Sequence, residues 1–118
     1  MNYTELRKEP RINVALLPEK YKEFEVLLAH GVTSIVKTAD VSSSGFGFYS
    51  DLPTDEFIPG QKIVLYPVGE THPVYGTIMH TEIIANQTRV GVLLGKFGGY
   101  EKYKEAIDEL LEQNQLSN

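Results

Sequence analysis

The chain has 118 residues, with 11 Lys and Arg against 16 Asp and Glu and a formal net charge of −5. This length supports one domain with its own hydrophobic core, and the acidic balance argues against binding DNA or RNA, which requires a field of Lys and Arg. The absence of cysteine excludes disulfides and thiolate metal sites. No run of ~20 apolar residues could cross a bilayer, and the polar first eleven residues do not resemble a secretory signal. We therefore expect a cytoplasmic protein without membrane insertion.

The first half of the chain has the pattern of short β-strands. Residues 11–17 place Ile12, Val14 and Leu16 on one face before Pro18, which predicts a strand that ends at the proline. Further runs rich in apolar or β-branched residues predict strands over 24–29, 32–38 and 46–49. The segments between these runs contain Gly and Ser and are expected to form turns.

The second half continues this pattern and then changes its period. A loop is expected over 53–60, a strand over 61–66, and a hairpin of two long strands, 74–84 and 88–94, around Asn86. After Gly99, apolar residues recur at spacings of three and four with acidic residues on the other face, which predicts one amphipathic helix of about 14 residues. Short strands followed by a single helix favour a small β-barrel or sandwich with the helix packed outside.

The first candidate binding feature is a pair of arginines before the first predicted strand. Pro10 disfavours a helix here, and in an extended chain residues four apart point to the same side, so Arg7 and Arg11 could converge on one ligand. The planar guanidinium matches phosphate oxygens and the O6/N7 edge of guanine. The alternative is a solvated basic arm without a ligand.

The second feature is the segment Asp40-Val-Ser-Ser-Ser-Gly45. Asp and Ser favour turns because their side chains bond to nearby backbone N–H groups, and Gly45 permits a close approach of ligand to backbone. A carboxylate at position 40 could accept from the N1–H and N2–H₂ groups of guanine. The alternative is a strand-to-strand turn that Asp40 and Ser42 stabilise.

In this order the two features, Arg-x-x-x-Arg and then Asp-x-Ser-x-x-Gly, resemble the two-part signature of PilZ domains. The likeness covers about residues 6–97 and extends to Pro10, Gly45-Phe-Gly-Phe48, Pro59-Gly60 and Arg89-Val-Gly-Val92. The resemblance implies a mainly β fold, a six-stranded antiparallel β-barrel with a C-terminal α-helix packed outside. It also implies a single domain over 1–118, with an N-terminal arm (1–11), the barrel (12–97) and the helix (99–114).

The resemblance further implies a bacterial second-messenger receptor that binds cyclic di-GMP and needs no other cofactor. Arg7 and Arg11 would contact phosphates and guanine, Asp40 and Ser42 would hold a guanine on the barrel, and Gly45 would allow the close turn. Binding would order the arm and change the surface that a downstream protein partner meets.

Neighbouring positions are second-tier candidates, namely Leu6, Lys8, Ser43 and Ser44. In the family, the residue before the first Arg influences whether one nucleotide or a stacked pair binds, and Leu6 favours one.

Two other classes of function remain as alternatives. A PilZ-like barrel could act as an adaptor through protein contacts alone, without nucleotide. An enzyme is not expected, because the sequence offers no recognisable nucleophile–base pair or carboxylate pair. Its three histidines lack metal-ligand spacing, so we predict neither catalytic residues nor a metal site. Tyr100 and Tyr103 are expected to be packing residues of the terminal helix.

Overall fold

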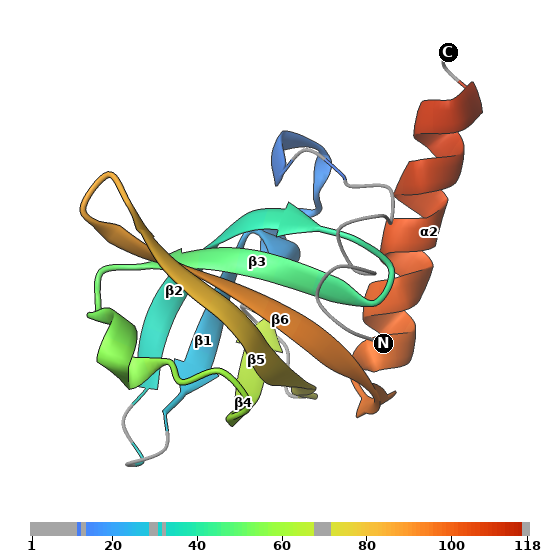
Figure 1. Ribbon diagram of the computed structural model, residues 1–118. Helices are drawn as coiled ribbons and strands as arrows, with labels where there is room; N and C mark the ends of the chain where they lie inside the picture. The colour runs from blue at the N-terminus through green and yellow to red at the C-terminus, as the bar shows by residue number, and fades with distance from the viewer. Residues whose placement is uncertain (1–11, 13, 29–30, 32, 68–71, 117–118) are drawn as a thin grey trace.

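The computed structural model describes residues 12, 14–28, 31, 33–67 and 72–116. They form a closed antiparallel barrel with the strand order β1-β2-β3-β6-β5-β4 and one C-terminal helix on its outside (Figure 1). The strands are β1 (Glu23–Leu27), β2 (Thr33–Val41), β3 (Gly45–Ser50), β4 (Lys62–Pro67), β5 (Val74–Ile84) and β6 (Gln87–Gly98). The helix is α2 (Tyr100–Leu116), and three short 3₁₀ turns are η1 (Val14–Leu16), η2 (Glu19–Tyr21) and η3 (Thr54–Glu56). This architecture confirms the predicted six-stranded barrel with an outer helix.

The barrel encloses a core in which phenylalanine rings follow one another. The ring centroids of Phe24 and Phe46 are 4.9 Å apart, those of Phe46 and Phe48 are 5.8 Å apart, and those of Phe48 and Phe57 are 5.5 Å apart. All four side chains are buried. Each buried ring contributes about 1.5–3 kcal/mol of transfer free energy, so this row stabilises the interior of the barrel.

The predicted strand over residues 11–17 is wrong. Residues 14–16 form the 3₁₀ turn η1, and Ile12 makes only an isolated bridge to Val41 in β2. Among the residues of this segment whose burial the structure describes, Ile12 and Leu17 are buried and Leu16 is 49% exposed, so Ile12 and Leu16 do not share a buried face. Pro18 also lacks the N–H that would continue a ladder.

The β5–β6 hairpin confirms the turn predicted at Asn86. Ala85 has φ 50° and Asn86 has φ 67°, and this pair of left-handed residues matches the right-handed twist of the flanking strands. The ladder carries a register shift between Ile78 and His80. The hairpin projects from the barrel at its upper left in Figure 1.

The predicted terminal helix is also confirmed, and it runs slightly beyond the expected range. Gly98 has φ 64°, a conformation that favours glycine, and it ends β6 immediately before α2 begins at Tyr100. Tyr100, Tyr103 and Ile107 are buried against the barrel, as their spacing predicts. Figure 1 shows α2 beside the connection from β2 to β3. Within the described residues, neither α2 nor any other helix has the length and apolar character needed to span a bilayer.

Candidate functional site

The segment Asp40–Gly45 connects β2 to β3 at the edge of the barrel that faces α2. The N–H of Ser42 donates to the carbonyl of Gly45 at 2.9 Å, and the Ser42 hydroxyl donates to the same oxygen at 3.3 Å. We call residues Ser42–Gly45 the β2–β3 turn. Ser42 is fully buried, and Ser44 is 7% exposed and accepts from the N–H of Leu94 at 2.9 Å. The turn is therefore a closed loop anchored to β6.

Gly45 lies at the first position of β3 and pairs with Leu93 of β6. Gly45 is buried. The close contact at this glycine is therefore between β3 and the neighbouring backbone of the barrel. The Ser42 hydroxyl also bonds within the turn, because it donates to the carbonyl of Gly45. Both residues lie in the predicted turn, and both give it its shape.

Asp40 precedes the turn and forms an ion pair with Arg89 of β6. Their side chains are 23% and 22% exposed, so the pair lies at the surface of the barrel with an open edge. Gly47 lies beneath it, because a Cβ built there would be 3.3 Å from Asp40 Oδ1 and 3.6 Å from Arg89 Nη2. The missing side chain at Gly47 thus lets the guanidinium reach across β3 to the carboxylate.

Two side chains of β5, Glu82 and His80, lie next to the ion pair of Asp40 and Arg89. Arg89 Nη1 lies 3.8 Å from Glu82 Oε1, and His80 Nε2 lies 3.5 Å from the same oxygen. Arg89 and Glu82 are directly opposite each other across the β5–β6 ladder. The guanidinium is thus placed between two carboxylates, which fixes its plane.

The sequence did not single out Arg89 as a site residue, because it lies 49 residues from Asp40. From the sequence, Arg89 can be assigned only to the last strand, and the pairing of that strand with β3 is needed to bring it near Asp40. Asp40 pairs with Gly47 of β3, and Arg89 pairs with Tyr49, two residues further along β3.

Helix α2 holds the β2–β3 turn from the side. The Tyr100 hydroxyl donates to the carbonyl of Ser43 at 3.0 Å, and the Tyr103 hydroxyl lies 3.1 Å from the carbonyl of Ser42 and 3.0 Å from that of Gly45. Both tyrosines are packing residues, as expected, but the bonds of their hydroxyls to the turn were not anticipated.

A third contact from α2 reaches the Ser43 side chain. The Ser43 hydroxyl donates to Asp108 Oδ1 at 3.0 Å, and Lys104 forms an ion pair with the other oxygen of that carboxylate. The hydrogen bond from Lys104 lowers the pKa of the Asp108 carboxyl, and the bond from Ser43 acts in the same direction. The same pairing raises the pKa of Lys104. Asp108 is thus held as an anion facing the turn.

Four predicted residues lie outside the described part of the chain: Leu6, Arg7, Lys8 and Arg11. The described chain begins at Ile12, whose N–H donates to the carbonyl of Val41 at 3.0 Å. Val41 lies between Asp40 and Ser42, so the chain enters the barrel directly beside the candidate turn.

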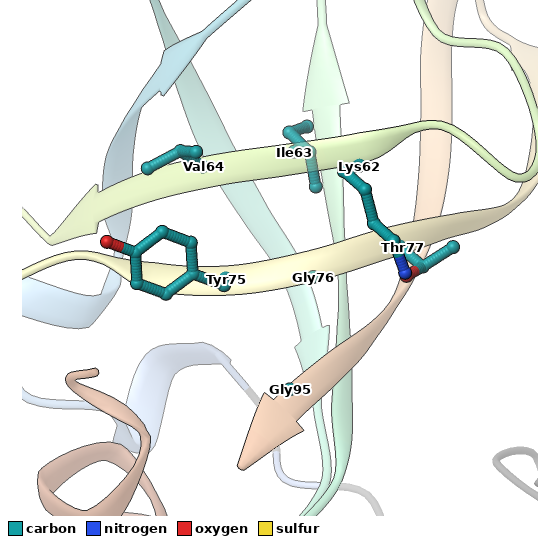
Figure 2. Close-up of a pocket in the computed structure, with 7 residues that line it drawn as sticks. All are labelled: Lys62, Ile63, Val64, Tyr75, Gly76, Thr77 and Gly95. Atoms are coloured by element: carbon teal, nitrogen blue, oxygen red, sulfur yellow. The ribbon is translucent and has the colours of Figure 1, made fainter. Parts of the chain in front are cut away.

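An apolar hollow of about 310 Å³ lies elsewhere on the barrel (Figure 2). We call it the β4–β5 hollow; its lining residues are Lys62, Ile63, Val64, Tyr75, Gly76, Thr77 and Gly95. Its polar contact is the bond from Lys62 Nζ to Thr77 Oγ1 at 2.9 Å. In the strand order, β4 and β5 are across the barrel from β2 and β3, and one lining residue of the hollow, Gly95 of β6, follows Leu94, whose N–H bonds to Ser44 in the turn.

Within the described ranges, no three His, Asp or Glu side chains gather closely enough to hold a metal ion.

No protein-family model matches the chain, and no curated protein matches its sequence. Solved structures do share the fold. The complex of K. pneumonia MrkH with c-di-GMP is 14% identical, with a TM-score of 0.64, over 94% of this chain and 53% of that chain. The Bacillus subtilis inhibitor of motility MotI/DgrA is 11% identical, with a TM-score of 0.62, over 95% of this chain and 52% of that chain. The chain therefore spans about half the length of the structures it matches, and at these identities the likeness establishes the fold.

Proposed function

We propose that this protein is a PilZ-type, non-catalytic receptor for cyclic di-GMP, with the ligand held between the N-terminal arm and the β2–β3 turn. The observation that carries the proposal is the bridge between Ile12 and Val41. Ile12 bridges to Val41, which lies between Asp40 and Ser42, and Arg11 precedes Ile12 in the sequence; this supports an arm from which Arg7 and Arg11 reach a ligand beside Asp40. The similarity of the fold to MrkH, which was solved in complex with c-di-GMP, supports the choice of ligand.

The chemistry of the described residues suits one guanine at this edge. The Asp40 carboxylate can accept from the N1–H and N2–H₂ groups of the base, and Arg89 fixes the direction in which its oxygens point. Ser42 and Gly45 shape the turn below it, and Ser43 and Ser44 complete the loop.

The guanidinium groups of Arg7 and Arg11 supply the cations that a dianionic ligand requires, with Lys8 as an additional charge. A micromolar Kd corresponds to about −8 kcal/mol, which a few charge-assisted bonds and base stacking can provide. Leu6 favours one nucleotide per site.

In this proposal the whole chain is one cytoplasmic signalling domain. Binding orders residues 1–11 over the barrel at 12–97 and so changes the surface offered to a downstream protein. The ligand is a small anion that placed cations recognise, in keeping with a net charge of −5, and DNA and RNA are not partners.

Isothermal titration calorimetry with cyclic di-GMP tests the proposal. We expect saturable binding by the wild-type chain and at least tenfold weaker binding by Arg11→Ala and Asp40→Ala. Matched controls are Lys62→Ala and Asp55→Ala, which remove one cation and one carboxylate from exposed positions away from the turn. Wild-type affinity in both Arg11→Ala and Asp40→Ala would contradict the proposal.

A thermal-shift screen separates the receptor from a nucleotide-independent adaptor. A ligand that binds only the folded state raises Tm by mass action. If saturating cyclic di-GMP leaves Tm unchanged, the barrel acts through protein contacts alone.

A further inference from the structure

Helix α2 contacts the β2–β3 turn through side chains whose polar ends all point at that turn. These are Tyr100, Tyr103 and Asp108, which together engage the backbone or side chains of Ser42, Ser43 and Gly45. The contacts join residues that are 57 to 65 positions apart in the sequence. The shape of the turn therefore depends on the seating of a helix that lies outside the barrel.

Tyr103 makes the most constrained of these contacts. Its side chain is fully buried, and its ring packs edge-on against Tyr21 with centroids 5.7 Å apart. This packing fixes the hydroxyl between the carbonyls of Ser42 and Gly45, at 3.1 and 3.0 Å. The single hydrogen of this hydroxyl is shared between the two carbonyls, and its position between them relates the first and last residues of the turn.

The middle of the turn is held by two further bonds to Ser43. Its carbonyl accepts from Tyr100 at 3.0 Å and its hydroxyl donates to Asp108 at 3.0 Å. Lys104, one helical turn before Asp108, forms the ion pair that orients this carboxylate. All these residues of α2 lie on the face that meets the turn.

We propose that Tyr103, Tyr100 and Asp108 are positioning residues of the nucleotide site, and that seating of α2 and ligand binding at the β2–β3 turn are thermodynamically coupled. This inference rests on the proposed function, because the ligand is the cyclic di-GMP assigned there. The helix holds the turn in the shape that presents Asp40 and the backbone of Ser42–Gly45 to the guanine. Coupling between two sites is reciprocal, so ligand binding also tightens the attachment of α2. Ligand binding at the turn would then change the surface of the protein through the attachment of α2.

Removal of single hydroxyl groups tests the positioning role by calorimetry. Tyr103→Phe keeps the buried ring and deletes the hydroxyl, and we expect its Kd for cyclic di-GMP to rise about tenfold. Tyr66→Phe on β4 is the matched control, with an unchanged Kd. At the surface, Asp108→Ala should weaken binding about fivefold, and Asp108→Asn, which keeps an acceptor for Ser43, should restore most of the affinity.

Hydrogen exchange separates positioning from a loss of stability. In the wild-type chain, saturating cyclic di-GMP should slow exchange of the α2 amides by at least fivefold, and in Tyr103→Phe this protection should be largely lost. The core variant Ile63→Val provides a chain with lowered Tm whose Kd should match the wild type. If ligand binds the wild type and Tyr103→Phe with equal Kd, the inference is overturned and the receptor proposal stands. If the wild type binds no cyclic di-GMP, both are overturned.

Discussion

The β2–β3 turn and the β4–β5 hollow lie on different sides of one barrel and are built from different kinds of surface. At and beside the turn, polar groups come from three elements: Asp40 of β2 pairs with Arg89 of β6, and Tyr103 of α2 bonds to the carbonyl of Ser42. The hollow has a volume of about 310 Å³, but its walls are apolar except for the bond between Lys62 and Thr77. An anionic nucleotide needs polar groups that are already oriented, so cavity size does not identify the site here.

A glycine lies at a close contact on each of these two sides of the barrel, but for different reasons. Gly76 faces the interior beside the hollow, where a Cβ would overlap Val92 Cγ1 and lie 3.1 Å from the carbonyl of Leu93. Gly47 lies under the ion pair of Asp40 and Arg89, where a Cβ would be 3.3 Å from Asp40 Oδ1 and 3.4 Å from the carbonyl of Val90. One glycine permits packing of the barrel and the other permits the charged pair of the site.

The largest expected effect is a loss of stability on the side of the hollow. Gly76→Ala should lower the free energy of unfolding by about 1–3 kcal/mol, because β5 must shift away from Val92. Urea denaturation measures this change. Calorimetry on the same variant should give the wild-type Kd for cyclic di-GMP, and a tenfold weaker Kd would mean that the two sides are not independent.

Gly47→Val should show the opposite pattern. A branched side chain at this position would push Asp40 and Arg89 apart, so we expect at least tenfold weaker binding of cyclic di-GMP. The loss of stability should be smaller than for Gly76→Ala, because a Cβ at Gly47 has no contact shorter than 3.3 Å, whereas a Cβ at Gly76 overlaps Val92. Calorimetry and thermal unfolding on the two glycine variants provide the comparison, and unchanged binding by Gly47→Val would contradict the role of the pair.

Arg89→Met removes the guanidinium that orients Asp40. We expect a three- to tenfold rise in Kd and a change in stability within about 1 kcal/mol, since the pair is partly exposed. Lys96→Met, an exposed cation on the same strand, is the matched control for the loss of one positive charge. Equal Kd values for these two variants would show that Arg89 acts only through net charge.

The stabilising contact between Asp108 of α2 and Ser43 should weaken at acid pH. The pKa of Asp108 is lowered in the folded chain by its bonds to Lys104 and Ser43, so its ionised form contributes to stability in full above the ordinary carboxyl pKa of about 4. That contribution is lost as the pH falls through the lowered pKa. The difference in Tm between the wild type and Asp108→Asn should therefore be constant from about pH 6 to 8 and disappear in strong acid. A difference that persists after Asp108 is protonated would argue against the ion pair.

The smallest effect is expected at Thr77 in the hollow. Thr77→Val removes the acceptor of the Lys62 bond from an exposed site, and both stability and Kd should stay within experimental error of the wild type. A measurable loss of nucleotide binding would move the site from the turn to the hollow.

Local patterns in the sequence predicted most of the barrel. Runs of apolar and β-branched residues predicted β1 to β6, Asn86 marked the hairpin, and spacings of three and four predicted α2. The segment at 11–17 failed because three alternating residues are too few to distinguish a strand from a 3₁₀ turn that buries Ile12 and Leu17. The turn expected at this motif is present over Ser42–Gly45, and Asp40 lies two residues before it, in β2.

The partners of that turn were beyond prediction from local sequence. Arg89 and Tyr103 lie 49 and 61 residues from the groups they contact, and such contacts follow from how the barrel closes and where α2 packs. Both residues fit their own local patterns, one as a strand residue and one as a buried helix residue. Those local patterns do not specify which groups the Arg89 guanidinium and the Tyr103 hydroxyl contact in the folded chain.

An NMR titration of the ¹⁵N-labelled full chain with cyclic di-GMP tests the location of the site most directly. We expect saturable shifts at the amides of Asp40 to Gly47, at Arg89 and at the turn-facing residues of α2, with Val64 and Tyr75 unmoved. Shifts that gather around Val64 and Tyr75, or no shifts at millimolar nucleotide, would contradict this location.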